Sequence, residues 1–85
     1  MQKIREALVK LSARANAIHG TMQNLQRSQA ASGLGMRRDW VQAASLMDSF
    51  LQGANDALRA GDAASAQDFL NKAETQVEKL ESALQ

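Results

Sequence analysis

The chain has 85 residues, with ten Lys and Arg, nine Asp and Glu, and no Pro, Tyr or Cys. This length predicts one domain over residues 1–85. The absence of Cys excludes disulfide bonds, thiolate catalysis and cysteine-bound zinc or iron–sulfur clusters. The absence of Pro and the wealth of strong helix formers predict an all-α fold. No apolar run approaches the roughly 20 residues of a spanning helix, so the sequence predicts no membrane span.

The first predicted helix covers about residues 2–31. Its apolar side chains recur at alternating steps of four and three, which is the pattern of a heptad seam. The seam consists of Ile4, Leu8, Leu11, Ala15, Ile18, Met22 and Leu25. Gly20 lies beside this seam and lowers helix propensity by about 1 kcal/mol. We therefore expect a continuous helix, in which Gly20 leaves room for close approach of a neighbouring helix or for a bend.

The second and third predicted helices, about residues 36–60 and 63–84, flank the dipeptide Gly61-Asp62. Gly suits the left-handed residue that ends a helix, and Asp suits the N-cap that begins one. Both helices carry the same alternation of steps, with Trp40, Ala44, Met47, Leu51, Ala54 and Leu58 in the second and Ala66, Leu70, Ala73, Val77, Leu80 and Leu84 in the third. The pattern predicts an αα-hairpin.

A second bend is predicted at Ser32-Gly33-Leu34-Gly35, where two glycines end the first helix. Folding back at both bends brings residues of similar size together. The predicted pairs are Leu58 with 64–66, Leu51 with 70–73, Trp40 with 80–84, Met22 with Met47, Ala15 with Ala54 and Leu11 with Leu58. We therefore predict an antiparallel three-helix bundle with coiled-coil-like heptad seams. This register leaves Ile4 projecting past the Gly61 corner.

Two resemblances concern the predicted hairpin. The run from Ala57 to Asp62, followed by Ala66, Leu70 and Ala73, resembles the helix–turn–helix unit of tetratricopeptide repeats over about 17 residues. The chain holds one such hairpin. The segments 32–39, 60–62 and 73–81 are similar to helical hairpins in larger bacterial signalling or envelope proteins. Both resemblances imply a helical interaction module.

The charge is unevenly distributed, although the net charge is only +1. Residues 1–38 contain seven Lys and Arg and one Glu, whereas residues 39–85 contain three Lys and Arg and eight acids. One interpretation is a basic helix that packs on an acidic hairpin. The other is a basic face that binds an anionic partner.

Residue types that support catalysis are scarce. His19 is the only His, and the chain has no Cys, so nucleophilic and metal-hydrolytic sites lack their usual residues. The acids of the second and third helices are spread along the chain and predict a solvated outer face. We therefore predict that the protein is not an enzyme and has no cofactor or metal. His19 is expected to make a local hydrogen bond.

The candidate partner interface combines apolar and basic side chains, namely Ile4, Leu8, Leu11, Arg37, Arg38 and Trp40. Arg and Trp are enriched in binding hot spots. In the alternative interpretation, Trp40 caps the core against Leu80 and Leu84. The two arginines would then lie near Glu78 and Glu81.

These features predict a non-catalytic protein–protein interaction or assembly module, as an accessory domain or fragment of a bacterial protein. Its first helix would pair with another copy or with a partner helix. The alternative is a small regulatory protein whose basic first helix contacts nucleic acid or an anionic surface. The basic residues are few and lack an aromatic platform, which argues against nucleic acid. Strong salt dependence of binding would distinguish the two functions.

Overall fold

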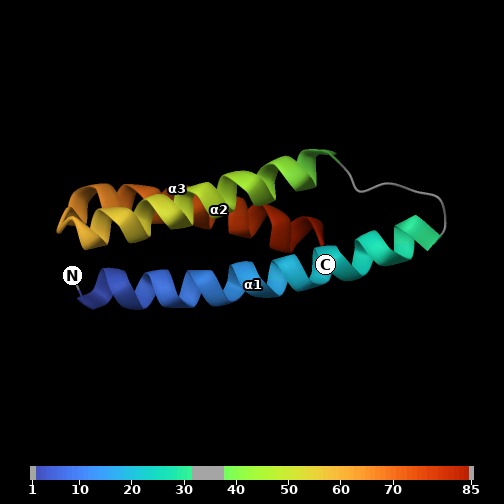
Figure 1. Ribbon diagram of the computed structural model, residues 1–85, viewed down its shortest axis with the longest axis horizontal. Coiled ribbons are helices and arrows are strands. Elements are labelled where there is room, and N and C mark those ends of the chain that lie inside the picture. Colours follow the sequence, from blue (N-terminus) through green and yellow to red (C-terminus); the bar gives the residue numbers. More distant parts are fainter. Residues whose placement is uncertain (1, 32–37, 85) are drawn as a thin grey trace.

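The computed structural model describes residues 2–31 and 38–84, and the side chains at 29–31 are left undescribed. Within these ranges the chain forms three α-helices: α1 (Gln2–Ala31), α2 (Arg38–Arg59) and α3 (Ala63–Ala83). α2 runs antiparallel to both α1 and α3, and the N-terminal end of α1 lies near the corner between α2 and α3 (Figure 1). The predicted all-α antiparallel three-helix bundle is therefore confirmed.

The predicted helix boundaries agree with the structure to within a few residues. α1 is continuous through Gly20, as expected. α2 begins at Arg38, whereas residues 36 and 37 of the predicted helix lie outside the described ranges. α2 and α3 each end one residue before the predicted position, which is the usual uncertainty at fraying helix ends.

The corner between α2 and α3 has the predicted chemistry. Gly61 has a φ of 77°, in the left-handed region. Its N–H donates to the Leu58 carbonyl at 3.1 Å and the Asp62 N–H donates to the Ala57 carbonyl at 2.8 Å, which together form a Schellman motif. The Asp62 carboxylate then accepts the backbone N–H of Ser65 at 3.0 Å and caps α3. One residue therefore closes one helix and the next begins another.

The buried core follows the predicted seams. Its main cluster joins all three helices and comprises Leu11, Ala15, Ile18, Met22, Ala43, Ala44, Met47, Ala54, Leu70, Ala73, Val77 and Leu80. A smaller cluster near the corner comprises Ala57, Leu58 and Ala66. Met47, Val77 and Leu80 are the largest fully buried side chains. The alternation of four and three thus identifies the inward face of every helix.

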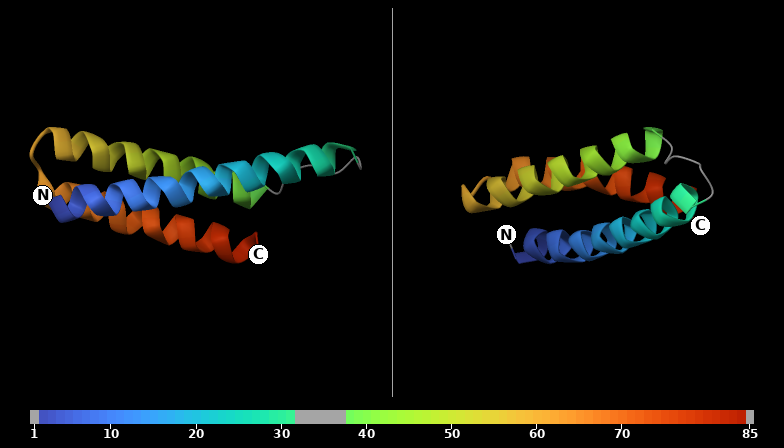
Figure 2. Two further views of the ribbon diagram at one scale, coloured as in Figure 1. Left: turned by 90° about the horizontal axis from the view of Figure 1, so that it is seen from below. Right: turned by 45° about the vertical axis from the view of Figure 1, so that its right-hand side comes forward.

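α1 extends beyond the hairpin at its C-terminal end, whereas the prediction placed the overhang at Ile4, so that prediction is wrong. Ile4 does not project past the Gly61 corner, because Ile4 and Leu8 are half-buried and pack against the Leu58 cluster. Leu11, the predicted partner of Leu58, belongs to the main cluster instead. The C-terminal turns of α1 extend beyond the start of α2 and the end of α3 (Figures 1 and 2). The predicted register required the end of α1 and the start of α2 to lie at the same height along the bundle. The two ends are instead offset by about one helical turn.

The close helix approach expected at Gly20 occurs at a different glycine. A Cβ at Gly20 would have no atom within 4 Å, so no neighbouring helix uses the room that Gly20 leaves. A Cβ at Gly53 would lie 2.9 Å from two ring carbons of Phe69. Gly53 thus admits the Phe69 ring between α2 and α3, and Lys72 lies over that ring at 5.9 Å from its centroid.

None of the helices in the described ranges is both long and apolar enough to cross a membrane. This agrees with the sequence-based expectation for those segments.

Candidate interaction surface

The structure separates the predicted interface residues into two groups at opposite ends of the molecule. Ile4 and Leu8 lie half-buried at the corner end, and Leu11 is buried in the core. Arg38 and Trp40 lie on the first turn of α2, near the other end, with Arg38 exposed and Trp40 half-buried. Arg37 lies outside the described residues. The assignment of both groups to one interface stays a prediction.

Trp40 lies where the alternative interpretation placed it. Trp40 and Leu84 are half-buried and pack against the main cluster, which contains Leu80. The carboxylate of Glu81, however, is bound by Arg14 of α1. The basic partner of Glu81 is therefore Arg14 of α1, whereas the alternative interpretation placed the arginines of the second helix near Glu81.

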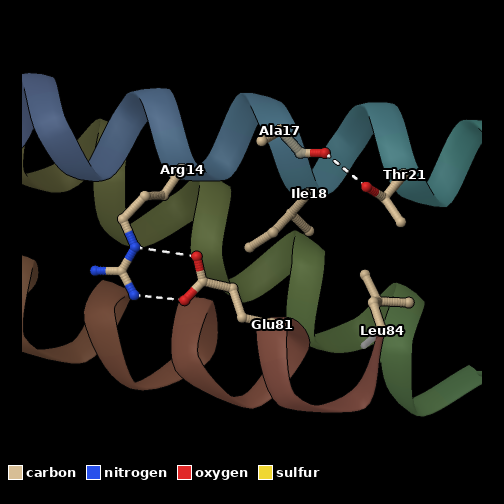
Figure 3. Close-up of a pocket in the computed structure, with 6 residues that line it drawn as sticks. All are labelled: Arg14, Ala17, Ile18, Thr21, Glu81 and Leu84. Carbon is tan, nitrogen blue, oxygen red and sulfur yellow. Dashed lines mark hydrogen bonds and ion pairs between the residues drawn. The ribbon is translucent and has the colours of Figure 1, made fainter.

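Arg14 and Glu81 form a two-pronged ion pair between α1 and α3 (Figure 3). Arg14 Nε donates to Glu81 Oε2 at 3.1 Å, and Arg14 Nη2 donates to Oε1 at 2.5 Å. This parallel geometry is the strong form of an Arg–carboxylate contact. The hydrogen bond from Arg14 lowers the pKa of the Glu81 carboxyl below its ordinary value, and the same bond raises the pKa of Arg14.

The hollow beside this ion pair has a volume of about 390 Å³. It is lined by Arg14, Ala17, Ile18, Thr21, Glu81 and Leu84 (Figure 3). The Thr21 hydroxyl donates to the Ala17 carbonyl at 3.1 Å, and the two charged groups satisfy each other. The polar groups are therefore used to join α1 to α3. The pair also realises the first charge interpretation, in which a basic helix packs on an acidic hairpin.

Two further hollows lie between α1 and α2. The corner hollow, of about 320 Å³, is lined by Arg5, Leu8, Val9, Asn55, Leu58 and Arg59. Two arginines from two helices flank an apolar floor here, and none of the lining residues is acidic. The hollow therefore combines positive charge with apolar surface.

The far hollow lies toward the other end of the same two helices and has a volume of about 440 Å³. It is lined by His19, Met22, Gln23, Gln26, Val41, Ala44, Ser45 and Asp48. His19 Nε2 lies 2.8 Å from Asp48 Oδ1, so the hydrogen bond of His19 joins two helices and is not the local bond that was predicted. Asp48 is the acidic residue of this lining, and neither Lys nor Arg contributes to it.

Both hollows lie on the same side of the α1–α2 pair. On α1, positions 5, 19 and 26 are separated by multiples of seven, as are positions 41, 48 and 55 on α2. Residues at this spacing share one face of a helix. The α1 residues that line hollows against α3 belong to a different series, which includes positions 7, 14 and 21. The corner and far hollows thus form one surface, here named the α1–α2 groove.

Two of the three exposed large apolar side chains in the described ranges line this groove. The three are Val9, Val41 and Leu46, with exposed fractions of 69%, 50% and 42%. Val9 lines the corner hollow and Val41 lines the far hollow. Neither valine was predicted as an interface residue. Each directly follows a seam residue and therefore lies outside the steps of four and three. A valine beside the seam in both helices was the available signal.

The groove lining contains few charged or titratable side chains. Within the described ranges, no group of three or more His, Asp or Glu side chains is arranged to hold a metal ion. His19 and Asp48 are exposed and bind each other. Apolar side chains, amides and a few charges are the groups that the groove offers to a partner.

No protein-family model, curated protein or solved structure matches this chain. The resemblances to tetratricopeptide repeats and to bacterial helical hairpins therefore stay predictions.

Proposed function

We propose that this protein is a non-catalytic protein–protein interaction module that binds a helix along the α1–α2 groove. The observation that carries the proposal is the placement of Val9 and Val41, two strongly exposed valines, in the two hollows of one groove. Contiguous apolar surface rimmed by polar residues marks interaction sites, and each valine extends the apolar lining of its own hollow. The sequence-based proposal of an interaction module is kept, and its contact surface moves from the seam of α1 to the adjacent groove.

A helix is the partner that suits this surface. The groove runs between two long helices, and its apolar positions lie near its two ends with polar side chains around them. An amphipathic helix placed in such a groove buries its apolar stripe and leaves its polar face in water. The resulting arrangement would resemble a four-helix bundle.

The proposal is tested with one pair of variants and a matched control. Val9→Glu combined with Val41→Glu places a charge in each hollow, whereas Leu46→Glu places the same charge on an exposed apolar position outside the groove lining. Tagged wild-type chain is expected to retain specific proteins, including copies of itself, from an extract of its source cells. The groove variant should lose them and the Leu46 variant should keep them. Equal retention by all three chains would contradict the proposal.

The predicted alternative, contact with nucleic acid or an anionic surface, gives a different outcome. Lys3, Arg5 and Lys10 are exposed on α1, but Arg14 is engaged by Glu81. Binding that weakens steeply with salt and is unaffected by the valine substitutions would favour the alternative.

A further inference from the structure

We propose that the α1–α2 groove binds the same groove of a second copy, in a two-fold symmetric dimer in which the two grooves run antiparallel. This inference rests on the proposed function, because it names the source of the helices that meet the groove, which are α1 and α2 of the second copy. It follows from the distribution of charge and apolar side chains along the groove.

The charges of the groove are self-complementary. The corner hollow carries Arg5 and Arg59 without an acid in its lining, and the far hollow carries Asp48 without Lys or Arg. A two-fold axis perpendicular to the groove places the corner hollow of one copy against the far hollow of the other. Two arginines of each copy would then face Asp48 of the other copy. A parallel arrangement would place arginines against arginines, which repel each other and disfavour that orientation.

The apolar side chains obey the same symmetry. The two-fold rotation that exchanges the hollows also brings Val9 of one copy toward Val41 of the other. Both valines are at least half exposed in the single chain. Removing this surface from water would stabilise the dimer, by about 25 cal/mol per Å² of apolar area buried. One contact type occurs twice in each dimer, as an isologous interface requires.

The middle of the groove permits close approach. Ser12 continues the series of positions 5, 19 and 26 on α1, and Gln52 continues the series of positions 45 and 59 on α2. Both lie midway between the hollows, where the two-fold axis would pass. A small hydroxyl and a flexible amide at the axis can form hydrogen bonds across it. The centre of the groove contributes no large side chain that would hold the copies apart.

The molecule is large enough for such an interface. The extents of the molecule along its principal axes are 47, 19 and 18 Å. A standard protein–protein interface buries about 800 Å² on each partner, so such a dimer would use most of one long side of the molecule. An 85-residue bundle has a small core, and burial of a second surface would add to its stability.

The first test is the mass of the chain in solution, measured by size-exclusion chromatography with light scattering over a wide concentration range. We expect a reversible dimer that Val9→Glu with Val41→Glu converts to a monomer, with a dissociation constant raised about tenfold or more. Leu46→Glu should leave the dimer unchanged. Circular dichroism of each variant checks that the helices are intact. A dimer that survives the two valine substitutions, or that Leu46→Glu disrupts equally, would overturn the assignment to the groove.

The orientation is tested by mixing two charge-reversed chains. Asp48→Arg alone, and Arg5→Glu with Arg59→Glu alone, should each weaken the homodimer by about tenfold, because like charges then face each other. In an equimolar mixture every Arg would face an acid again, so a heterodimer of near wild-type affinity is expected. Failure of the mixture to associate would overturn the antiparallel arrangement.

A cross-linking control uses the absence of natural Cys. Asn16→Cys lies in the series of positions 9 and 23 near the axis, whereas Asn24→Cys lies on α1 in another series. A short bismaleimide linker should join two copies at position 16 much faster than at position 24. A chain that stays monomeric up to about 1 mM would overturn the dimer. Retention of a different protein by the groove would then still support the proposed function.

Discussion

The two sides of α2 differ in how completely they are closed. Toward α3, Gly53 receives the Phe69 ring and the Gly61-Asp62 corner fixes both helix ends by hydrogen bonds. Toward α1, two open hollows remain, with exposed valines in them. The contact between α2 and α3 is therefore closely packed, whereas the α1–α2 side keeps apolar surface exposed to solvent.

The difference has a cause in the connections between the helices. Only Ala60, Gly61 and Asp62 join α2 to α3, so the corner itself sets the register of the hairpin. α1 and α2 are joined by residues 32–37, and the end of α1 lies beyond the start of α2 (Figure 1). The side chains of α1, including Arg14 in its pair with Glu81, hold it against the hairpin.

The largest expected effect comes from identical truncations on the two sides. Leu80→Ala removes a fully buried side chain of α3 and should lower the free energy of unfolding by about 2–5 kcal/mol. Leu8→Ala removes a half-buried side chain of α1 and should cost about half as much, because less of it leaves water on folding. Urea denaturation of both variants measures the ratio. Equal losses would show that α1 is held as tightly as the hairpin.

A smaller effect is expected at the corner. Gly61→Ala forces a residue with a Cβ into the left-handed region, at a cost of about 1–2 kcal/mol. Gly20→Ala in the middle of α1 is the control, since its Cβ meets open space and should stabilise the helix by about 1 kcal/mol. Thermal unfolding should therefore shift in opposite directions for the two substitutions. A shift in the same direction would contradict the role of Gly61 in closing the hairpin.

The closed packing of α2 on α3 is tested at Gly53. Gly53→Ala gains about 1 kcal/mol of helix propensity, but its Cβ would meet the Phe69 ring at 2.9 Å and displace it. We expect no net gain or a small loss. In a Phe69→Ala background the same substitution should stabilise the protein as Gly20→Ala does. A double-mutant cycle measures this coupling, and an additive result would refute the close contact.

The sequence predicted the parts of the fold that local chemistry determines. The seams identify the buried faces, Gly61 the left-handed residue and Asp62 the cap, and each is a short-range signal. The same reasoning placed Ile4 beyond the corner, because it assumed level helix ends across a six-residue connection whose span the sequence does not define.

The candidate surface was harder to predict than the fold. A groove between α1 and α2 depends on which pair of helices packs less closely, and all three seams look alike in the sequence. Val9 and Val41 can be recognised as parts of one groove only when the relative position of their two helices is known. Gly53 similarly gave no sign of the ring that it accommodates, whereas Gly20 resembled a packing glycine and faces open space.

The smallest expected effect is the loss of stability in acid, which involves one carboxylate at the hairpin corner and one at the contact between α1 and α3. Hydrogen bonds from Ser65 lower the pKa of Asp62 at the hairpin corner, and the bond from Arg14 lowers the pKa of Glu81 at the α1–α3 contact. Because both groups titrate at their ordinary, higher pKa in the unfolded chain, the unfolded state takes up protons first as the pH falls. The free energy of unfolding should therefore be constant near neutrality and decrease below about pH 5.

Variants assign this loss to the two carboxylates. Asp62→Asn keeps a capping side chain without a titrating group, and Arg14→Met removes the donor that lowers the pKa of Glu81. Each should make stability less dependent on pH between about pH 5 and pH 3, and the two effects should add because the sites lie on different helix contacts. Urea denaturation at several pH values gives both slopes. If Arg14→Met left the slope unchanged, α1 would be held to the hairpin by its apolar seam alone, and the ion pair would only mark where the two helices meet.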